Sequence, residues 1–174
     1  MRILVAGGAG YIGSHTVVAL VERGHEVVVA DDLSNAKRAV VDRVAEITGV
    51  QVPLEVVDLT DAERTDDLFA GAGFEAVVHF AGRKAVGEST RVPLSYYRTN
   101  LDSTFSLLEA MARHDVRRLV FSSSATVYGD GAPVPYPETY PHLSAASPYG
   151  RTKVMIERIL TDVATASPDL RVAM

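Results

Sequence analysis

The sequence contains no cysteine among its 174 residues, and this absence excludes several kinds of chemistry. Without thiols the chain forms no disulfides, binds no zinc through thiolates and has no cysteine nucleophile. The histidines lack the spacing of metal ligands, so we expect no metal site. They number five: His15, His25, His79, His114 and His142.

The chain also lacks a long apolar run and a basic cluster. No segment approaches the roughly 20 apolar residues of a membrane-spanning helix, and no cleavable signal pattern precedes the first strand-like segment. Asp and Glu number 22 against 17 Lys and Arg, which gives a formal net charge of −5. We therefore expect a cytoplasmic protein that binds neither membranes nor nucleic acid.

The sequence does contain a regular alternation of strand-like and helix-like segments. Short apolar runs predict strands over residues 2–6, 26–31, 53–58, 75–81 and 117–123. Apolar residues at helical spacing predict helices over residues 11–23, 36–48, 61–70, 96–114 and 147–166. Glycines and prolines predict a loop over residues 129–137. This order predicts an α/β fold of the Rossmann type, a doubly wound parallel sheet with helices on both faces.

Gly7, Gly10 and Gly13 directly follow the first predicted strand and open the first predicted helix. At such a turn, residues without side chains let a pyrophosphate approach the backbone N–H groups and the positive end of the helix dipole. Asp31 ends the second predicted strand, 18 residues beyond Gly13. A carboxylate there accepts hydrogen bonds from both ribose hydroxyls of adenosine and repels a 2′-phosphate. The pattern therefore predicts a site for NAD rather than NADP.

The end of the sequence has the pattern of a sixth strand over residues 169–174, with no helix or polar tail after it. The length favours a single domain. We therefore expect residues 1–174 to be an NAD-binding Rossmann domain, cut from a longer protein whose C-terminal substrate-binding domain is absent from this chain.

A second group of polar residues follows the fifth predicted strand and opens the last predicted helix. Tyr149 and Lys153 are four residues apart, so they share one face of that helix. A lysine ammonium near a phenol favours the phenolate, which makes the tyrosine a usable general base. Alone, this spacing is more typical of a packed tyrosine beside a solvated lysine. Together with the glycine loop and the serines at 122–124, it favours a catalytic pair.

Four segments carry a family resemblance: residues 7–15, 80–89, 122–129 and 147–153. Together they resemble the UDP-glucose 4-epimerases (UDP-galactose 4-epimerases), which are extended short-chain dehydrogenase/reductases. The first and last segments are typical of all extended reductases. Residues 84–89 and 124–129 point to the epimerases in particular.

This resemblance implies an isomerase that inverts C4 of a UDP-hexose in galactose metabolism, interconverting UDP-glucose and UDP-galactose with bound NAD. It implies that Tyr149 takes the proton of the sugar 4-hydroxyl while the C4 hydride passes to NAD⁺. Lys153 binds the nicotinamide ribose, and Ser124 hydrogen-bonds the 4-oxygen. The 4-keto sugar then turns and takes the hydride back on its other face.

The resemblance further implies a set of residues that contact NAD. Tyr11 and Ile12 join the glycines at the pyrophosphate, and Asn35 joins Asp31 near the adenosine ribose. The others flank the adenine or line the path toward the nicotinamide: Asp58, Leu59, Phe80, Ala81, Gly82, Lys84, Thr99, Asn100 and Ser122. Two simpler interpretations stay open, a helix cap for Asp58 and a solvated surface side chain for Lys84.

Two alternative functions also stay open. A non-catalytic NAD-binding module needs the glycine loop and Asp31 but not Ser124, Tyr149 or Lys153, and the presence of these three argues against it. A nucleotide-sugar 4,6-dehydratase needs an additional acid and base just after the serine of the fifth strand. Residues 125–126 are alanine and threonine, which can do neither at the required pKa.

Packing accounts for other conspicuous residues. His79 lies on an apolar strand, so we expect a core histidine whose hydrogen bonds are satisfied. The helix predicted over residues 96–114 carries an apolar face that fits either core packing or pairing of subunits in a homodimer. That face consists of Leu101, Phe105, Leu108 and Met111.

Overall fold

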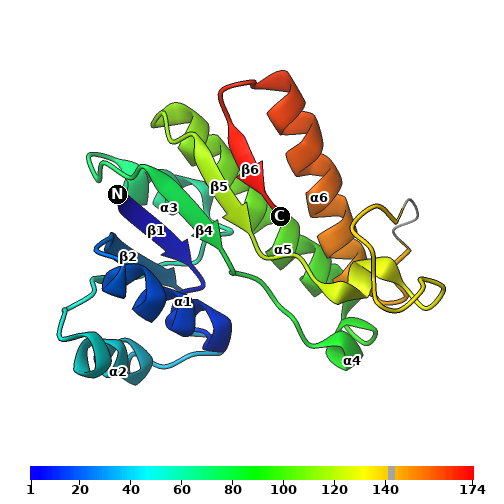
Figure 1. Cartoon of the computed structure of the whole chain (residues 1–174), viewed down its shortest axis with the longest axis horizontal. Coiled ribbons are helices and arrows are strands. Elements are labelled where there is room, and N and C mark those ends of the chain that lie inside the picture. Colours follow the sequence, from blue (N-terminus) through cyan, green and yellow to red (C-terminus); the bar gives the residue numbers. More distant parts are fainter. Residues whose placement is uncertain (141–143) are drawn as a thin grey trace.

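The computed structural model describes residues 1–140 and 144–174 and has the predicted doubly wound α/β architecture (Figure 1). One six-stranded parallel sheet has the order β3-β2-β1-β4-β5-β6. Its strands are β1 (Arg2–Ala6), β2 (Glu26–Asp31), β3 (Leu54–Val56), β4 (Ala76–His79), β5 (Arg118–Phe121) and β6 (Arg171–Ala173). The winding direction reverses between β1 and β4, and ligands of such sheets bind outside the strand ends at this switch point.

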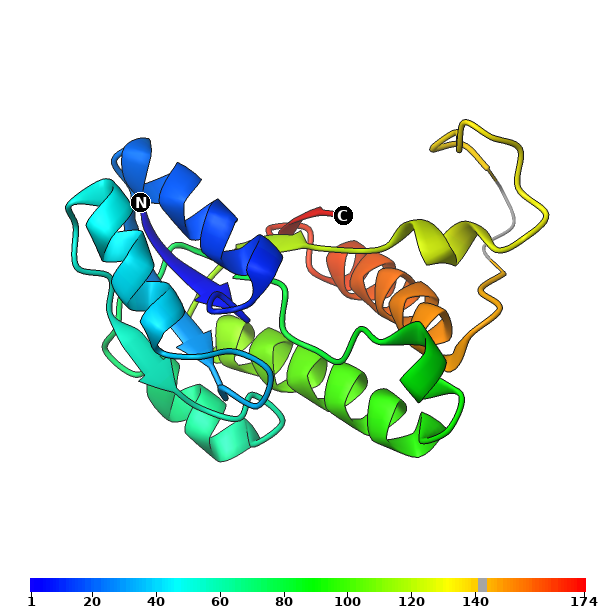
Figure 2. The same ribbon diagram turned by 90° about the horizontal axis from the view of Figure 1, so that it is seen from below.

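Helices cover both faces of the sheet. The pair α1 (Tyr11–Glu22) and α2 (Ala39–Thr48) packs on one face. The helices α3 (Ala62–Phe69), α5 (Pro93–Arg113) and α6 (Pro148–Ala166) pack on the other. Figure 2 shows α1, in blue, and α5, in green, on opposite sides of the strands. The short α4 (Val86–Ser89) and the 3₁₀ helix η1 (Ala125–Tyr128) lie beyond the carboxyl ends of β4 and β5 (Figure 1).

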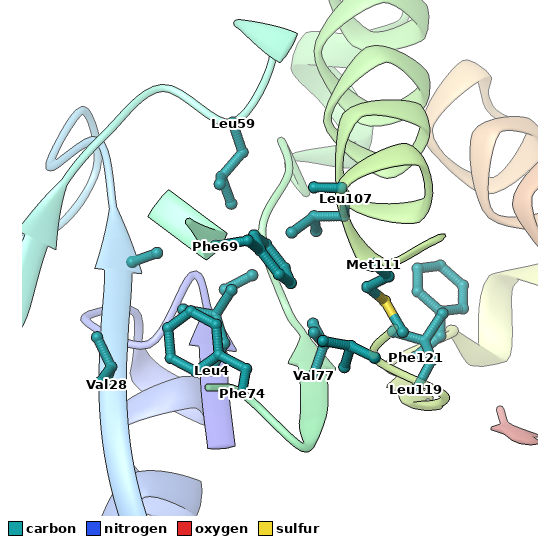
Figure 3. Packing of buried hydrophobic residues seen from close by; sticks show 14 of the residues in the cluster. Leu4, Val28, Leu59, Phe69, Phe74, Val77, Leu107, Met111, Leu119 and Phe121 are labelled. Atoms are coloured by element: carbon teal, nitrogen blue, oxygen red, sulfur yellow. The ribbon is translucent and has the colours of Figure 1, made fainter. Parts of the chain in front are cut away.

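Alternate residues of the central strands pack into two separate hydrophobic cores, because successive strand side chains point to opposite faces. Leu4 lies with Phe69 of α3 and Met111 of α5 in one core (Figure 3). Val5, the next residue along β1, lies with Val17 of α1 in the other. All five side chains are at most 2% exposed. The two cores fix the sheet between its helix layers and so fix the positions of its strand ends.

The predicted elements are confirmed, with shifted ends and two additions. Helix α5 begins at Pro93 rather than residue 96, because proline suits the first turn of a helix. Helix α2 begins at Ala39 rather than residue 36. The additions, α4 and η1, have four residues each, too few to produce a recognisable periodicity. Residues 129–137 form the expected loop.

The apolar face of α5 is explained mainly by the core. Met111 is 1% exposed, and Leu101 and Leu108 pack against the same core as partly buried residues. Phe105 is 42% exposed, so this one member of the face remains for other contacts. The homodimer stays a prediction. None of the described helices combines the length and the apolar character needed to cross a bilayer.

Candidate functional site

Two glycines at the turn from β1 into α1, Gly7 and Gly13, have no room for a side chain. Gly7 has a φ of +76°, and a Cβ there would lie 2.6 Å from the Ala81 nitrogen. A Cβ on Gly13 would overlap the Gly7 carbonyl oxygen and lie 2.8 Å from Gly8 Cα. The loop and the first turn of α1 can therefore pack this closely only as glycine. This is the geometry in which backbone N–H groups reach a bound phosphate.

The N-terminus of α1 is open to a ligand. Its N-cap residue is Gly10, which provides no side-chain hydrogen bond to the first turn. The first N–H groups of a helix have no partner within the helix, so an anion can accept hydrogen bonds from them. Tyr11 and Ile12 flank this turn and are 74% and 54% exposed. Both are among the residues that the family resemblance implies at the pyrophosphate.

Asp31 lies at the carboxyl end of β2, next to the glycine loop. One carboxylate oxygen accepts a hydrogen bond from Ala9 N at 3.1 Å, and the other accepts one from Leu33 N at 3.0 Å. Burial raises the pKa of Asp31, and these two backbone hydrogen bonds oppose that rise. A carboxylate accepts about four hydrogen bonds, so the oriented group can still accept from ribose hydroxyls. Asn35 is exposed on the loop that follows.

The structure decides one open alternative at the end of β3. Asp58 accepts hydrogen bonds from Thr60 N at 2.9 Å and from the Thr60 hydroxyl at 2.8 Å. It does not cap α3, because the N-cap is Asp61, which accepts from the first-turn N–H groups. The capping interpretation of Asp58 is therefore wrong. Leu59 is 4% exposed, so its side chain belongs to the core and only its backbone can face an adenine.

Asn100 connects the loop after β4 to the helix that carries Tyr149. Its Oδ1 accepts from Arg83 N at 2.7 Å, and its Nδ2 donates to Arg83 O and to Thr152 Oγ1, both at 3.0 Å. Gly82 gives it room, because a Cβ there would lie 2.8 Å from Asn100 Oδ1. Both amide hydrogens of Asn100 thus have partners within the protein. The family resemblance implies that Asn100 contacts the cofactor, but these hydrogen bonds within the protein were not predicted.

Four further residues that the resemblance implies as NAD contacts lie on or near this loop, and they differ in how far they are buried. Phe80 directly follows β4, and its N–H donates to Ala6 O at 2.7 Å. Ala81 follows it and packs against the core. Thr99 is half-buried on α5. Lys84 is exposed, so both of its interpretations stay open.

Arg83, which is exposed on the same loop, lies beside a buried tyrosine and an acidic residue. The Tyr96 hydroxyl donates to Glu88 Oε2 at 2.6 Å, and Arg83 Nη1 lies 3.9 Å from the same oxygen. Burial raises the pKa of Tyr96, and its hydrogen bond to Glu88 raises it further. These contacts tie α4 to α5 and hold the segment that carries Lys84.

Tyr149 and Lys153 lie in the first two turns of α6. Ser147 caps the helix by accepting from Gly150 N at 3.1 Å, and Pro148 fits the first turn. Tyr149 is 9% exposed. Its hydroxyl makes no hydrogen bond to any residue that the structure describes, so it can bond to a ligand.

Lys153 is 6% exposed, and its ammonium contacts residues at the carboxyl end of β5. Its Nζ donates to Ser122 O at 2.8 Å and lies 4.4 Å from the centre of the Phe121 ring, a cation–π contact. Burial lowers the pKa of Lys153 to about 8, although the charge of Glu157 opposes this shift. The ammonium is therefore fixed beside the strand end, with a pKa near neutrality.

Ser124 caps η1 at the carboxyl end of β5. Its Oγ accepts from Thr126 N at 3.3 Å and from the Thr126 hydroxyl at 2.9 Å. Gly150 lets η1 approach α6, because a Cβ there would lie 3.1 Å from Thr126 Oγ1. The structure thus brings the Ser124 segment beside the turn that carries Tyr149. The sequence predicts no role for Thr126 in orienting Ser124, apart from its position two residues later.

His79 is a core histidine, and the structure satisfies only one of its ring nitrogens. Its Nε2 lies 3.0 Å from the Thr104 hydroxyl, which donates to Asn100 O at 2.8 Å. The network therefore assigns the ring proton to Nε2, and the buried Nδ1 has no hydrogen-bond partner among the residues that the structure describes. Burial, with Lys153 nearby, lowers the pKa of His79 to about 3.

The parallel sheet with its reversal between β1 and β4, the glycine loop and the carboxylate at the end of β2 define the doubly wound dinucleotide-binding class of proteins. Within the described part of the chain, no three His, Asp or Glu side chains gather closely enough to hold a metal ion. The chain belongs to the NAD dependent epimerase/dehydratase family, whose sequence model matches residues 3–174.

Its relatives include UDP-glucose 4-epimerases. The protein of that name from Bacillus subtilis is 53% identical over 174 residues, which cover 100% of this chain and 51% of the relative. The one from Erwinia amylovora is 52% identical over 171 residues, or 98% of this chain and 51% of the relative. The chain thus spans about half the length of the curated relatives it matches.

Solved structures agree with the fold. The UDP-glucose 4-epimerase of Bifidobacterium longum, in complex with NAD⁺ and UDP, superposes with a TM-score of 0.96 at 41% identity, over 99% of this chain and 51% of that one. The Stenotrophomonas enzyme with bound NAD and formylated UDP-arabinopyranose gives 0.95 at 45% identity, with the same coverage. The predicted Rossmann fold is confirmed.

Proposed function

We propose that this chain is the NAD-binding part of a UDP-glucose 4-epimerase that interconverts UDP-glucose and UDP-galactose in galactose metabolism. The observation that carries the proposal is the buried Lys153 ammonium, which donates to Ser122 O one helical turn from Tyr149. A structural lysine is rarely buried this far without a carboxylate in direct contact. Its position at the carboxyl edge of the sheet, where this class binds its ligands, favours a role in chemistry.

The residues of the site fit a dinucleotide. The uncapped first turn of α1 and the glycine loop would hold the pyrophosphate, and Asp31 would accept from the adenosine ribose. Lys153 would reach the nicotinamide ribose, since its ammonium has one fixed protein acceptor and two further hydrogens. Held by these residues, NAD would supply a reversible hydride acceptor for the sugar C4.

The protein groups move and hold the proton. Tyr149, whose hydroxyl has no partner among the described residues, would act as the phenolate: its oxygen would accept the proton of the sugar 4-hydroxyl as the hydride leaves C4, and would give the proton back to the 4-oxygen after the sugar has turned. Lys153 lies one helical turn after Tyr149 on the same face of α6, so its ammonium would add a positive charge to the side of the helix that carries the proton acceptor. Ser124 would hydrogen-bond the 4-oxygen in both orientations of the sugar.

The relatives are about twice as long as this chain, so we propose that their other half corresponds to the part of the enzyme that holds the uridine and most of the sugar. On this proposal residues 1–174 bind NAD alone but do not turn over UDP-sugars. The choice between hexoses and their relatives would then depend on residues outside this chain.

The test joins residues 1–174 to the second half of the Bacillus subtilis relative and follows UDP-galactose conversion to UDP-glucose. We expect turnover by the chimera, no turnover by the chain alone, and a loss of at least about 100-fold in Tyr149→Phe with NAD binding retained. Tyr97→Phe, a half-buried tyrosine on α5, serves as the matched control. Unchanged turnover in Tyr149→Phe would remove this residue from the mechanism. A 4,6-dehydro sugar as product would identify a dehydratase instead.

A further inference from the structure

Helix α6 is joined to the end of β5 by two adjacent polar contacts. Lys153 donates to the backbone oxygen of Ser122, at 2.8 Å. The hydroxyl of the next residue, Ser123, donates to the carboxylate of Glu157. Glu157 follows Lys153 by one helical turn, so the two contacts lie side by side along the helix. The proposed mechanism uses the first contact but gives no role to the second.

We propose that Glu157 is a positioning residue for the reaction proposed above: tethered by Ser123 one helical turn after Lys153, its carboxylate helps to keep the Lys153 ammonium charged. The inference rests on the proposed function for its consequence, but the contact itself is a property of this chain. Glu157 acts through Lys153, and nothing in the structure places it against a substrate.

The surroundings of Lys153 show why a carboxylate is needed. From β4 the titratable neighbour is His79, which is buried and neutral. From β5 the ammonium meets the Phe121 ring and the Ser122 carbonyl, neither of which carries a charge. On α6 itself, Glu157 lies one helical turn after Lys153. Among the described residues, it is the group whose negative charge opposes the effect of burial on the ammonium.

The tether matters because a free glutamate side chain has several rotamers. The Ser123 hydroxyl lies at the end of β5 and fixes the carboxylate on the inner side of α6. This keeps the negative charge on the same side of the helix as Lys153. Because burial already brings the pKa of Lys153 to about 8, loss of that charge would leave much of the lysine neutral at physiological pH. A neutral lysine no longer places a positive charge on the face of α6 that carries Tyr149.

The composition of the chain allows a direct test. It contains three lysines, and Lys37 and Lys84 are exposed. Lysine labelled with ¹³C at Cε therefore gives three NMR signals, of which the buried Lys153 is the one with a displaced titration. The measurement uses the 174-residue chain without NAD, so it does not depend on turnover.

We expect the Lys153 signal of Glu157→Gln to titrate about one pH unit lower than that of the unmodified chain, because the variant keeps the shape but not the charge. Glu157→Asp, which keeps the charge, should restore part of the shift. Asp162→Asn removes an exposed carboxylate from the same helix and should change nothing. An unchanged Lys153 titration in a folded Glu157→Gln variant would overturn the proposal.

Further measurements separate a failure of the Glu157 proposal from a failure to fold and from a failure of the proposed function. If circular dichroism shows that Glu157→Gln does not fold, Ser123→Ala is titrated instead, and an unchanged Lys153 signal there would also overturn the proposal. In the chimera, the alkaline limb of the pH–rate profile should move to lower pH in Glu157→Gln. If the unmodified chain fails to bind NAD in calorimetry, the proposed function fails, whereas the Lys153 titration still decides the role of Glu157.

Discussion

At the scale of single residues, the close packing at Gly13 predicts that a side chain there weakens both folding and NAD binding. Gly13→Ala would place a Cβ against the Gly7 carbonyl oxygen and 2.8 Å from Gly8 Cα, so the loop must open to admit it. We expect a loss of about 1–3 kcal/mol in the free energy of unfolding, the usual cost of overpacking. The cradle for the pyrophosphate should be lost as well, with at least about tenfold weaker NAD binding.

Gly87→Ala is the matched control for that variant, because a Cβ at Gly87 meets nothing within 4 Å. It should bind NAD and unfold like the unmodified chain. Urea denaturation and calorimetric titration measure the two effects. NAD binding by Gly13→Ala at full affinity would show that the loop does not form the binding site.

The sequence alone predicts those candidate site residues that follow a local spacing. The glycines, Asp31 and the Tyr149–Lys153 pair follow fixed spacings, and the structure places each beside the carboxyl edge of the sheet. The hydrogen bond from Asn100 to Thr152 joins residues 52 positions apart, so no local pattern in the sequence predicts it. The hydrogen bond from Ser123 to Glu157 also joins distant parts of the chain and was not predicted. The spacing of four residues between Lys153 and Glu157 is the one local signal for it.

At the scale of elements, the start of α6 positions Tyr149 and depends on its cap. Ser147→Ala removes the oxygen that accepts from Gly150 N, and Ser147 is 7% exposed. We expect a loss of about 1 kcal/mol in the free energy of unfolding, because a buried N–H group of the first turn loses its partner.

Ser167→Ala, at the opposite end of α6, tests whether that loss is specific to the cap. The side chain of Ser167 makes no hydrogen bond to any described residue, so its removal should change the urea midpoint little. Equal midpoints for the two variants would contradict the importance of the N-terminal cap.

Element boundaries were predictable where periodicity or strand patterns extend over many residues. The long helices α1 and α6 match their expected ranges closely, and residues 169–174 contain β6. The start of α5 at Pro93 was missed because residues 93–95 continue no apolar pattern. Helix α4 and η1 depend on tertiary contacts, such as the hydrogen bond from Tyr96 to Glu88 that anchors α4.

At the scale of the whole molecule, the buried His79 makes stability depend on pH. Its pKa falls from 6.5 in the unfolded chain to about 3 in the folded one, so between these values the unfolded state binds the extra proton. Stability is therefore complete above pH 6.5 and decreases as the pH falls. At pH 5 this single group accounts for about 2 kcal/mol, from 1.36 kcal/mol per pH unit over 1.5 units.

Urea unfolding at pH 7.5 and pH 5 measures this effect. His79→Gln retains a donor for Thr104 but does not titrate, so we expect it to remove about 2 kcal/mol of the difference between the two pH values. The control is His15→Gln, on the exposed surface of α1. An equal pH dependence in His79→Gln would show that the buried ring is not the source.

The topology of the whole sheet followed from the alternation of elements, since parallel strands joined by right-handed crossovers leave few arrangements. The arrangement of the candidate site could not be predicted from the alternation of elements alone. The site joins the ends of β1, β2, β4 and β5 with the starts of α1 and α6. The distances between these elements depend on how the two cores pack.

The central claim is that these strand ends form an NAD site, and a calorimetric titration of the 174-residue chain tests it most directly. We predict saturable binding of one NAD⁺ per chain and binding of NADP⁺ weaker by at least about tenfold, because Asp31 would repel the 2′-phosphate. Absence of NAD⁺ binding by the folded chain, or equal affinity for both dinucleotides, would contradict the account.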